Sequence, residues 1–381
     1  MDKAKSLVFG ALVALAAGLL PAAGALAQDR IESSAGPLTL AEIASGLDTP
    51  WSLAFLPDGA MLVTERPGRM RIVSASGEVS APIAGVPAVH AEGQGGLLDV
   101  VLGPDFAHDR RIFFSFAEPT RRGARTAVAS ARLDAAALRL DDVRKVFGQN
   151  DDPSGRHHWG SRLVFAPDGS LFVTLGDRFF HRDKAQQLDN HFGKIVRIRP
   201  DGSTPDDNPF VGRPGALADI WSYGHRNVQG AALNPATGVL WTHEHGPQGG
   251  DEVNVGSAGG NYGWPAITHG REYGSGARIG EGTARADVIE AVKVWIPSIA
   301  PSGMQFYTGE ALPAWRGSLF VGALSGQLLV RLALDGDRVI GEERLLEGLG
   351  IRVRDVRQGP DGFIYLLDEG RGRILRLSPA S

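Results

Sequence analysis

One short pattern recurs along the chain and restricts its fold more than any other feature. An apolar run leads into Pro-Asp-Gly, or a near variant, and a second apolar run follows. Proline presets one φ angle of such a turn and glycine supplies a positive one, so each copy predicts a hairpin between two strands. Six copies occur, at residues 55–59, 103–106, 165–169, 234–238, 312–315 and 359–362.

The spacing of these copies predicts the architecture. They lie roughly 45 to 80 residues apart, which is typical of propeller blades with insertions of variable length. We therefore expect an all-β fold, a six-bladed β-propeller of four-stranded antiparallel blades. A β-sandwich or several unrelated β domains are the alternatives, because Pro-Asp-Gly turns are common. No linker divides the sequence, so residues 28–381 are expected to form one domain, with 28–34 as a loose lead-in and 134–143 as a short helix or an irregular insertion.

The N-terminus has the composition of an export signal. Lys3 and Lys5 precede an apolar run over residues 7–20, and residues 25–27 (Ala-Leu-Ala) fit a small-x-small cleavage site. We expect residues 1–27 to be a signal peptide and the mature protein to be periplasmic or secreted, without a membrane span. A membrane anchor is the alternative, but the run falls short of the ~20 residues that a bilayer span needs.

Composition excludes several chemistries. The 381 residues contain no cysteine, which rules out disulfides, thiol nucleophiles, iron–sulfur clusters and covalently attached haem. The formal net charge of −4 provides no basic field for a nucleic-acid partner. A monomer is the default oligomeric state.

Two histidines precede a predicted strand and provide a candidate base. His158 follows His157, and a histidine near its ordinary pKa suits proton removal from an alcohol at neutral pH. Asp177 ends the next strand, so a strand out and a strand back bring its carboxylate towards the His158 imidazole. Metal ligands or plain surface residues are the alternatives for this pair.

Three polar segments have the chemistry of an anion site. Gln94 lies between glycines that allow close backbone approach, although an ordinary turn has the same composition. Arg226 next to Asn227 suits a planar, oxygen-rich anion, or loop carbonyls. Arg352 and Arg354 point to one side of a strand, where two like charges are costly unless an anion lies between them. A solvated strand face is the alternative for the arginine pair.

The densest polar segment runs from residue 243 to 252. His243 and His245 share a strand face, but no third ligand is fixed by spacing and no H-E-x-x-H motif is present, which disfavours zinc. Carboxylates, turn carbonyls and glycines suit calcium better, because it accepts several oxygen ligands in flexible loops.

Taken together, six segments resemble the soluble quinoprotein sugar dehydrogenase family. Its periplasmic aldose sugar dehydrogenase branch, which uses pyrroloquinoline quinone (PQQ) and calcium, is the most similar. The family's fold is a six-bladed propeller, in agreement with the turn count. The segments are Gly-Gln-Gly-Gly-Leu-Leu (93–98), His-Trp-Gly-Ser-Arg-Leu (158–163), Gly-His-Arg-Asn-Val-Gln-Gly (224–230), His-Glu-His-Gly-Pro-Gln-Gly-Gly-Asp-Glu (243–252), Gly-Gly-Asn-Tyr-Gly-Trp-Pro (259–265) and Arg-Val-Arg-Asp-Val (352–356).

The resemblance implies a role for each matching residue. His158 matches the catalytic base, which takes the proton of the anomeric hydroxyl while hydride passes from sugar C1 to PQQ C5, and Asp177 matches its carboxylate partner. Arg226 stabilises charge that develops on a quinone oxygen. The PQQ-binding set is Gln94, His158, Arg226, Asn227, His245, Arg352 and Arg354, with glutamine in some relatives at the position of His245. Carbonyls of Gly246 and Pro247 match the ligands of a calcium that polarises PQQ, and Glu252 and Tyr262 match a second, structural calcium site.

One position departs from the family pattern. The family often has a lysine near the cofactor, and Ser325 occupies the corresponding position in this chain. An aldose substrate and an external electron acceptor are the expected partners. A calcium-dependent propeller lactonase is one alternative, but it would not need the arginine pair or Gln94. A non-catalytic binding propeller is the other, but it leaves His158, Arg226 and the arginine pair unexplained as a group.

Overall fold

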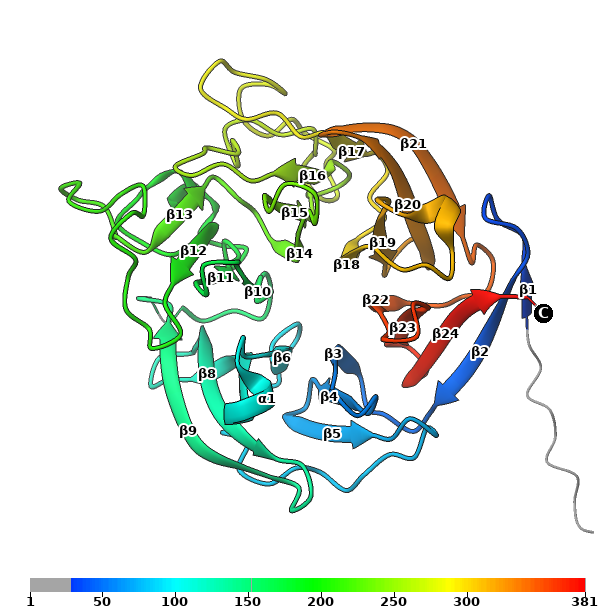
Figure 1. Cartoon of the computed structure of the whole chain (residues 1–381). Coiled ribbons are helices and arrows are strands. Elements are labelled where there is room, and N and C mark those ends of the chain that lie inside the picture. The colour runs from blue at the N-terminus through cyan, green and yellow to red at the C-terminus, as the bar shows by residue number, and fades with distance from the viewer. Residues whose placement is uncertain (1–28, 152, 381) are drawn as a thin grey trace, which may run out of the picture.

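The computed structural model describes residues 29–151 and 153–380. The predicted signal peptide, residues 1–27, lies outside the described residues. Six antiparallel sheets stand as blades around a central axis (Figure 1), which confirms the predicted propeller. Helical structure in the described part of the chain is limited to α1 (Phe106–Asp109) and the 3-10 turns η1 (Arg182–Gln186) and η2 (Pro313–Trp315). No helix among these residues is long and apolar enough to cross a membrane.

The blades follow one another along the chain, and the strands of each run outward from an innermost strand. Blade 1 comprises β3 (Pro50–Phe55), β4 (Met61–Glu65) and β5 (Arg69–Val73). Blade 2 comprises β6 (Leu97–Leu102), β7 (Arg111–Pro119), β8 (Ala124–Asp134) and β9 (Arg139–Gly148). Blade 3 comprises β10 (Leu163–Phe165), β11 (Leu171–Thr174), β12 (Lys194–Ile198) and β13 (Ile220–Tyr223).

The second half of the ring has the same order. Blade 4 comprises β14 (Val228–Leu233), β15 (Leu240–Glu244), β16 (Asp251–Val255) and β17 (Lys293–Trp295). Blade 5 comprises β18 (Pro301–Phe306), β19 (Leu319–Ala323), β20 (Leu328–Asp335) and β21 (Arg338–Leu345). Blade 6 comprises β22 (Val353–Gln358), β23 (Ile364–Asp368), β24 (Arg373–Pro379), β2 (Leu38–Ala44) and β1 (Asp29–Ile31).

All six predicted turns join the innermost strand of a blade to its second strand. In the Pro-Asp-Gly copies, Gly59, Gly169 and Gly362 have φ angles of 85°, 82° and 77°, a region that glycine enters without steric cost. The aspartate caps the turn, because Asp58 Oδ1 accepts the main-chain N–H of Ala60 at 3.1 Å. The repeat therefore marks one face of the ring six times.

Two expectations about local structure are wrong. Part of the expected lead-in, Asp29–Ile31, forms β1 and pairs with β2. Residues 134–143 are neither a helix nor an irregular insertion, because β8 continues to Asp134 and β9 starts at Arg139 in a hairpin. The sequences of these two segments do not by themselves show which strands they pair with.

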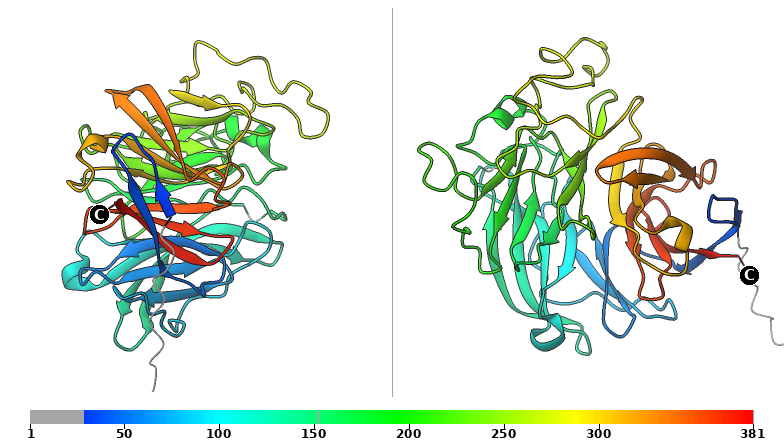
Figure 2. Two further views of the ribbon diagram at one scale, coloured as in Figure 1. Left: turned by 90° about the vertical axis from the view of Figure 1, so that its right-hand side faces the viewer. Right: turned by 45° about the horizontal axis from the view of Figure 1, so that its top comes forward.

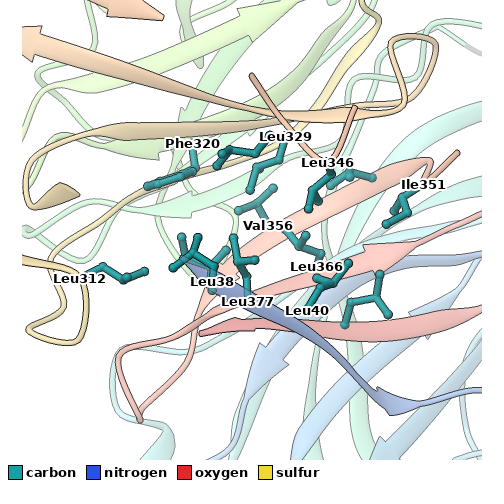
Figure 3. Close-up of a cluster of buried hydrophobic side chains, with 14 of the residues drawn as sticks. Leu38, Leu40, Leu312, Phe320, Leu329, Leu346, Ile351, Val356, Leu366 and Leu377 are labelled. Atoms are coloured by element: carbon teal, nitrogen blue, oxygen red, sulfur yellow. The ribbon is translucent and has the colours of Figure 1, made fainter. Parts of the chain in front are cut away.

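The ring is closed by strands from both ends of the chain. β2 pairs with β24, so that Leu40 lies opposite Leu377. Leu38 and Leu40 are buried in a cluster with Leu377 and with residues of blade 5 such as Phe320 (Figure 3). The buried apolar side chains of β2 and β24 thus pack blade 6 against blade 5.

The sheet topology gathers the predicted site residues at one end of the ring. The Pro-Asp-Gly turns occupy one edge, so the start of each innermost strand and the end of each second strand lie at the opposite edge. Most of the predicted residues fall at those two positions in blades 2, 3, 4 and 6. Glu252 reaches the same edge from the third strand of blade 4, where it pairs with Glu244, and Tyr262 follows that strand. The long connection between β16 and β17 projects beyond the sheets (Figure 2).

Candidate active site

The predicted base and its carboxylate lie in contact. His158 lies before β10 and Asp177 after β11, and these two strands are antiparallel neighbours. The distance from His158 Nδ1 to Asp177 Oδ1 is 2.6 Å, and both side chains are buried. This pair has the geometry of an imidazole oriented by a carboxylate.

The imidazole is neutral at physiological pH. Burial and the Arg226 guanidinium lower the pKa of His158 to about 4, although Asp177 opposes the shift. Burial on its own raises the pKa of Asp177, but His158 and Arg226 outweigh burial and keep it below its usual value. An ionised carboxylate at Nδ1 fixes the proton there and leaves the Nε2 lone pair available as a base.

Asp177 is held by two further donors. Trp264 Nε1 donates to Asp177 Oδ2 at 2.8 Å, and the main-chain N–H of Phe179 donates to Oδ1 at 2.8 Å. Trp264 lies in the connection between β16 and β17, a different blade from Asp177. Sequence reasoning identified Trp264 only as part of a glycine-rich motif, because nothing local indicates a contact across blades.

Gln94 holds the loop that carries the base. Its side-chain Oε1 accepts the main-chain N–H of His158 at 2.8 Å, and its own N–H donates to the Arg156 carbonyl at 2.8 Å. His158 has a φ of 55°, a region that residues with a side chain seldom adopt. Gln94 therefore contacts the backbone of the base in this structure.

Arg226 lies next to the pair and packs among aromatic rings. Its Nη1 donates to the carbonyl oxygens of His245 at 2.9 Å and Gly246 at 2.6 Å. Its Nη2 lies 3.3 Å from the Tyr273 hydroxyl, and the guanidinium lies 5.4 Å from the Trp264 ring centre. Arg226 is thus a buried cation whose hydrogen-bond partners are neutral, which leaves its charge available to an anion.

A buried chain of hydrogen bonds positions the backbone of Arg226. Glu244 Oε2 accepts the Arg226 N–H at 2.5 Å, and Glu244 Oε1 lies 2.8 Å from His225 Nδ1. Ser222 Oγ completes the chain at 2.9 Å from His225 Nε2. All four residues are buried, so this arrangement resembles a hydrolytic triad in geometry but has no access for a substrate.

A cavity of about 280 Å³ opens at these groups. Its volume is close to the lower end of the range for small-molecule sites. Its lining contains both aromatic and charged side chains, which suits a ligand with both carbon faces and hydroxyl groups. The lining residues are His158, Asp177, Phe179, Phe180, Arg182, Asp183, Arg226, Pro247, Trp264, Glu272, Tyr273 and Ile279.

Asn227 has an unused donor next to Arg226. Its Oδ1 accepts the main-chain N–H of Gly160 at 3.2 Å and the Gln229 amide at 3.3 Å. Its Nδ2 is buried and has no hydrogen-bond partner. A buried amide without a partner is costly, so this donor points to a ligand that the chain itself does not provide.

The arginine pair of blade 6 has a partner that sequence reasoning missed. The expected anion between Arg352 and Arg354 is the carboxylate of Glu369, which follows β23. Glu369 Oε2 lies 3.1 Å from Arg352 Nη2, and Oε1 lies 2.9 Å from Arg354 Nη2. The pairing of Val353 with Asp368 could have indicated this contact, by the same reasoning that placed Asp177 at His158.

The segment after β15 presents main-chain oxygens towards the site. Gly246 donates its N–H to Asp251 Oδ1 at 2.9 Å, and its carbonyl accepts from Arg226. Pro247 lines the cavity. In residues 29–151 and 153–380, no three His, Asp or Glu side chains cluster in a manner that could hold a metal ion. A calcium ion at this point depends on carbonyl oxygens, each of which has two lone pairs.

Glu252 lies beside other acidic side chains at a partly buried position. It pairs across β15 and β16 with Glu244, and burial together with this neighbour raises the pKa of Glu252 to about 8. A cavity of about 300 Å³ adjoins Glu252, Tyr262, His269 and Glu290. This combination of carboxylate, carbonyl oxygens and space fits a hard cation.

The side chains of Tyr262 and His245 both form hydrogen bonds within the chain. The Tyr262 hydroxyl donates to the Val255 carbonyl at 2.7 Å and accepts the Ser257 N–H at 2.9 Å, so a metal ligand from Tyr262 has to be its main-chain carbonyl. His245 Nε2 lies 2.5 Å from the Pro301 carbonyl, which occupies that ring nitrogen.

Comparison with known proteins identifies the family. The family model described as glucose/sorbosone dehydrogenase matches residues 47–376. The chain belongs to this family. The membership confirms the predicted resemblance and the expectation of an oxidoreductase.

Relatives of this glucose/sorbosone dehydrogenase family member cover nearly all of its length. Aldose sugar dehydrogenase YliI of Escherichia coli is 48% identical over 338 residues, which is 87% of this chain and 91% of the relative. The crystal structure of the E. coli soluble aldose sugar dehydrogenase in the apo form has a TM-score of 0.87 at 46% identity, and covers 90% of this chain and 100% of its own. The PQQ-bound aldose sugar dehydrogenase of Streptomyces coelicolor has a TM-score of 0.74 at 30% identity, with 90% and 98% covered.

The residues of this family member fit a planar polyanion such as PQQ. Arg226 provides a buried donor at the cavity, and the adjacent Asn227 has a buried Nδ2 without a partner. The blade 6 arginines provide two more guanidinium groups. Ser325 lies exposed after β19 and contributes no charge at the position of the family lysine. The site is therefore cationic, and Ser325 adds no charge to it.

Proposed function

We propose that the protein oxidises the C1 hydroxyl of aldose sugars to the lactone, with PQQ as cofactor, calcium as a structural and polarising ion, and an external electron acceptor. One observation carries the proposal. A buried histidine oriented by an ionised aspartate lies next to an arginine at the floor of a cavity, in a propeller of the sugar dehydrogenase family.

His158 is the general base of the proposed reaction. Its Nδ1 is bonded to Asp177, so Nε2 is the nitrogen that takes the proton of the C1 hydroxyl. Loss of that proton allows the C1 hydride to leave, and bound PQQ supplies the acceptor for it. The low pKa of His158 means that the base is ready at neutral pH without a prior deprotonation.

Asp177 and Arg226 support the base through charge. Asp177 stabilises the imidazolium that forms when His158 takes the proton, because opposite charges 2.6 Å apart interact strongly at a buried site. Arg226 stabilises negative charge that develops on the ligand side of the cavity. Trp264 and Phe179 fix the carboxylate, so that the imidazole needs no reorganisation during proton transfer.

The remaining residues would hold the two bound groups. Asn227, Arg352 and Arg354 would bind PQQ together with Arg226, and Gln94 would act by holding the backbone of His158. We assign Gly246 and Pro247 to the calcium next to the cofactor. We assign Glu252 and the Tyr262 carbonyl to a second calcium, supported by the raised pKa of Glu252.

The location of the enzyme also belongs to the proposal. Export to the periplasm or medium rests on the predicted signal peptide over residues 1–27. We propose a monomer as the default oligomeric state. Because the sequence has no haem motif, the enzyme would pass its electrons to a separate carrier.

Reconstitution tests this function. Apo-protein in calcium buffer is titrated with PQQ, and the reduction of an artificial dye is followed with a panel of aldoses. We expect turnover that requires PQQ, calcium and an aldose together. Absence of PQQ binding ends the assignment, and lactone hydrolysis becomes the next assay.

A pair of neighbouring variants assigns the base. His158→Ala should retain PQQ binding but lose at least about 100-fold in kcat, the lower end for general-base removal. His157→Ala is the matched control, because that imidazole is exposed and lies outside the cavity lining. Equal activity of the two variants removes His158 from the mechanism.

A further inference from the structure

The carboxylate of Glu369 bridges two arginines that the proposed function needs for cofactor binding. Arg354 directs both Nε, at 3.2 Å, and Nη2, at 2.9 Å, to Glu369 Oε1. Arg352 Nη2 reaches Oε2 at 3.1 Å. Each oxygen of the carboxylate thus serves a different guanidinium group.

The remaining contacts show that this arrangement is fixed from several sides. Glu369 donates its main-chain N–H to the Arg352 carbonyl at 3.0 Å, which anchors the turn after β23 to the start of β22. Arg354 Nη1 is 3.0 Å from Gln229 Oε1, and Arg352 Nη1 is 3.1 Å from the Leu324 carbonyl. Each guanidinium group has five N–H donors, so both retain donors that these contacts leave unused.

Burial and charge explain why Arg352 and Arg354 need the Glu369 carboxylate. The side chains of Glu369 and Arg354 are each 8% exposed, whereas that of Arg352 is 40% exposed. Burial favours the protonated form of Glu369, but Arg354 and Arg352 outweigh it and lower the pKa of the carboxyl group. The ionised carboxylate therefore offsets repulsion between two cations that lie two residues apart, one just before β22 and one within it.

We propose that Glu369 is a positioning residue that serves as the resident counter-anion of Arg352 and Arg354, and that it opposes the binding of cofactor carboxylates at this pair. The inference rests on the proposed function, because it takes PQQ as the ligand of the arginines. The pair and its counter-anion together carry one net positive charge, and Ser325 adds none. Stability without cofactor is gained at the expense of cofactor affinity.

Glu369→Gln separates charge from shape. The apo-variant should melt at a lower temperature than wild type, because the two guanidinium groups lose their counter-anion. Its affinity for PQQ should rise roughly tenfold, the order expected when one opposing unit charge is removed from a partly buried anion site. Binding is measured in calcium buffer without sugar, from tryptophan fluorescence during PQQ titration, so the readout does not depend on turnover.

Glu118→Gln is the matched control. Glu118 also bridges two cations, Arg125 at 2.6 Å and Lys145 at 2.9 Å, but on the second, third and fourth strands of blade 2. Its loss should affect the melting temperature slightly and the PQQ affinity not at all. Unchanged or weaker PQQ binding in Glu369→Gln overturns the inference.

A second variant keeps the test decisive if Glu369→Gln does not fold. Glu369→Asp retains the charge but shortens the side chain, so it should lower the apo melting temperature while its PQQ affinity stays within about threefold of wild type. A tenfold gain in affinity for Glu369→Asp contradicts a role through charge. If neither wild type nor variants bind PQQ, the proposed function falls with the inference. If wild type binds and the variants do not differ from it, only the role of Glu369 falls.

Discussion

Asp177→Asn tests the orientation of the base most directly. The substitution preserves the shape of the side chain but replaces one acceptor oxygen with an NH₂ donor. Asp177 accepts from three groups, of which the Trp264 ring N–H and the Phe179 main-chain N–H can only donate. An amide therefore cannot satisfy every contact, whichever way it is turned.

Both orientations of the new amide have a cost that can be worked out. With its oxygen towards Trp264, the NH₂ group donates to His158 Nδ1, which moves the imidazole proton to Nε2 and removes the base. With its oxygen towards His158 and Phe179, the NH₂ group faces the Trp264 N–H, at about 1–3 kcal/mol for the unsatisfied buried donor. An Asp-to-Asn change that reverses the tautomer in a Ser-His-Asp triad costs about 10⁴-fold in kcat. We expect a fall in kcat of about 10²- to 10⁴-fold.

The assay is dye reduction by the PQQ-reconstituted variant, with a C1-deuterated aldose to show that C1–H cleavage limits the rate. PQQ binding should persist, because Asp177 contacts none of the proposed cofactor arginines except through the carbonyl of Arg226. Loss of the carboxylate also removes an interaction that raises the pKa of His158, so the acid limb of kcat/KM should move to lower pH. Asp201→Asn, in an exposed turn, is the control. A variant that retains a third of wild-type kcat with a normal isotope effect refutes the role of Asp177.

Three further predictions concern charge at other positions. After chelator treatment, the Glu252→Gln variant should be at least as stable as wild type. Added calcium should no longer raise its melting temperature. If calcium still raises it, Glu252 is not a calcium ligand. Lys194 is fully buried and donates to the carbonyls of Lys184, Ala185 and Phe192. Lys194→Met should therefore reduce the unfolding free energy by about 2–4 kcal/mol in denaturant titration. An unchanged midpoint contradicts this prediction. Burial also lowers the pKa of Lys194 to about 7. Its buried charge should therefore reduce the free energy of unfolding most below pH 7, and this reduction should disappear as the pH rises towards 10.5. Ser325→Lys should tighten PQQ binding several-fold at low salt and less at high salt, and a salt-independent change refutes an electrostatic cause.

The fold was predictable because its signal is local. Every Pro-Asp-Gly copy lies at the same place in its blade, and the residues that shape the turn are adjacent in the sequence. The closure of blade 6 was not predictable in this way. β2 and β24 pair through contacts between opposite ends of the chain, and neither strand contains a feature that names its partner.

The site divides in the same way. His158 and Asp177 could be placed together because one hairpin connects them, and the structure gives that contact. Trp264 and Tyr273 could not be placed, because they reach the site from a long connection in another blade. Glu369 was missed because the arginine pair suggested an anion from outside the chain, whereas the turn after a neighbouring strand supplies one.

Blade 6, which combines strands from both ends of the chain, determines how the molecule folds and unfolds. The ring can close only after the last strand of the chain is available, since β24 lies between β23 and β2. Closure brings together segments near opposite ends of the chain, which makes it a late and slow step. Until then Leu366 and Leu367 lack the cover that β2 and β24 provide, and the chain is open to self-association. Removing β24 should therefore open the ring, because β2 and β23 would both lose the strand that lies between them.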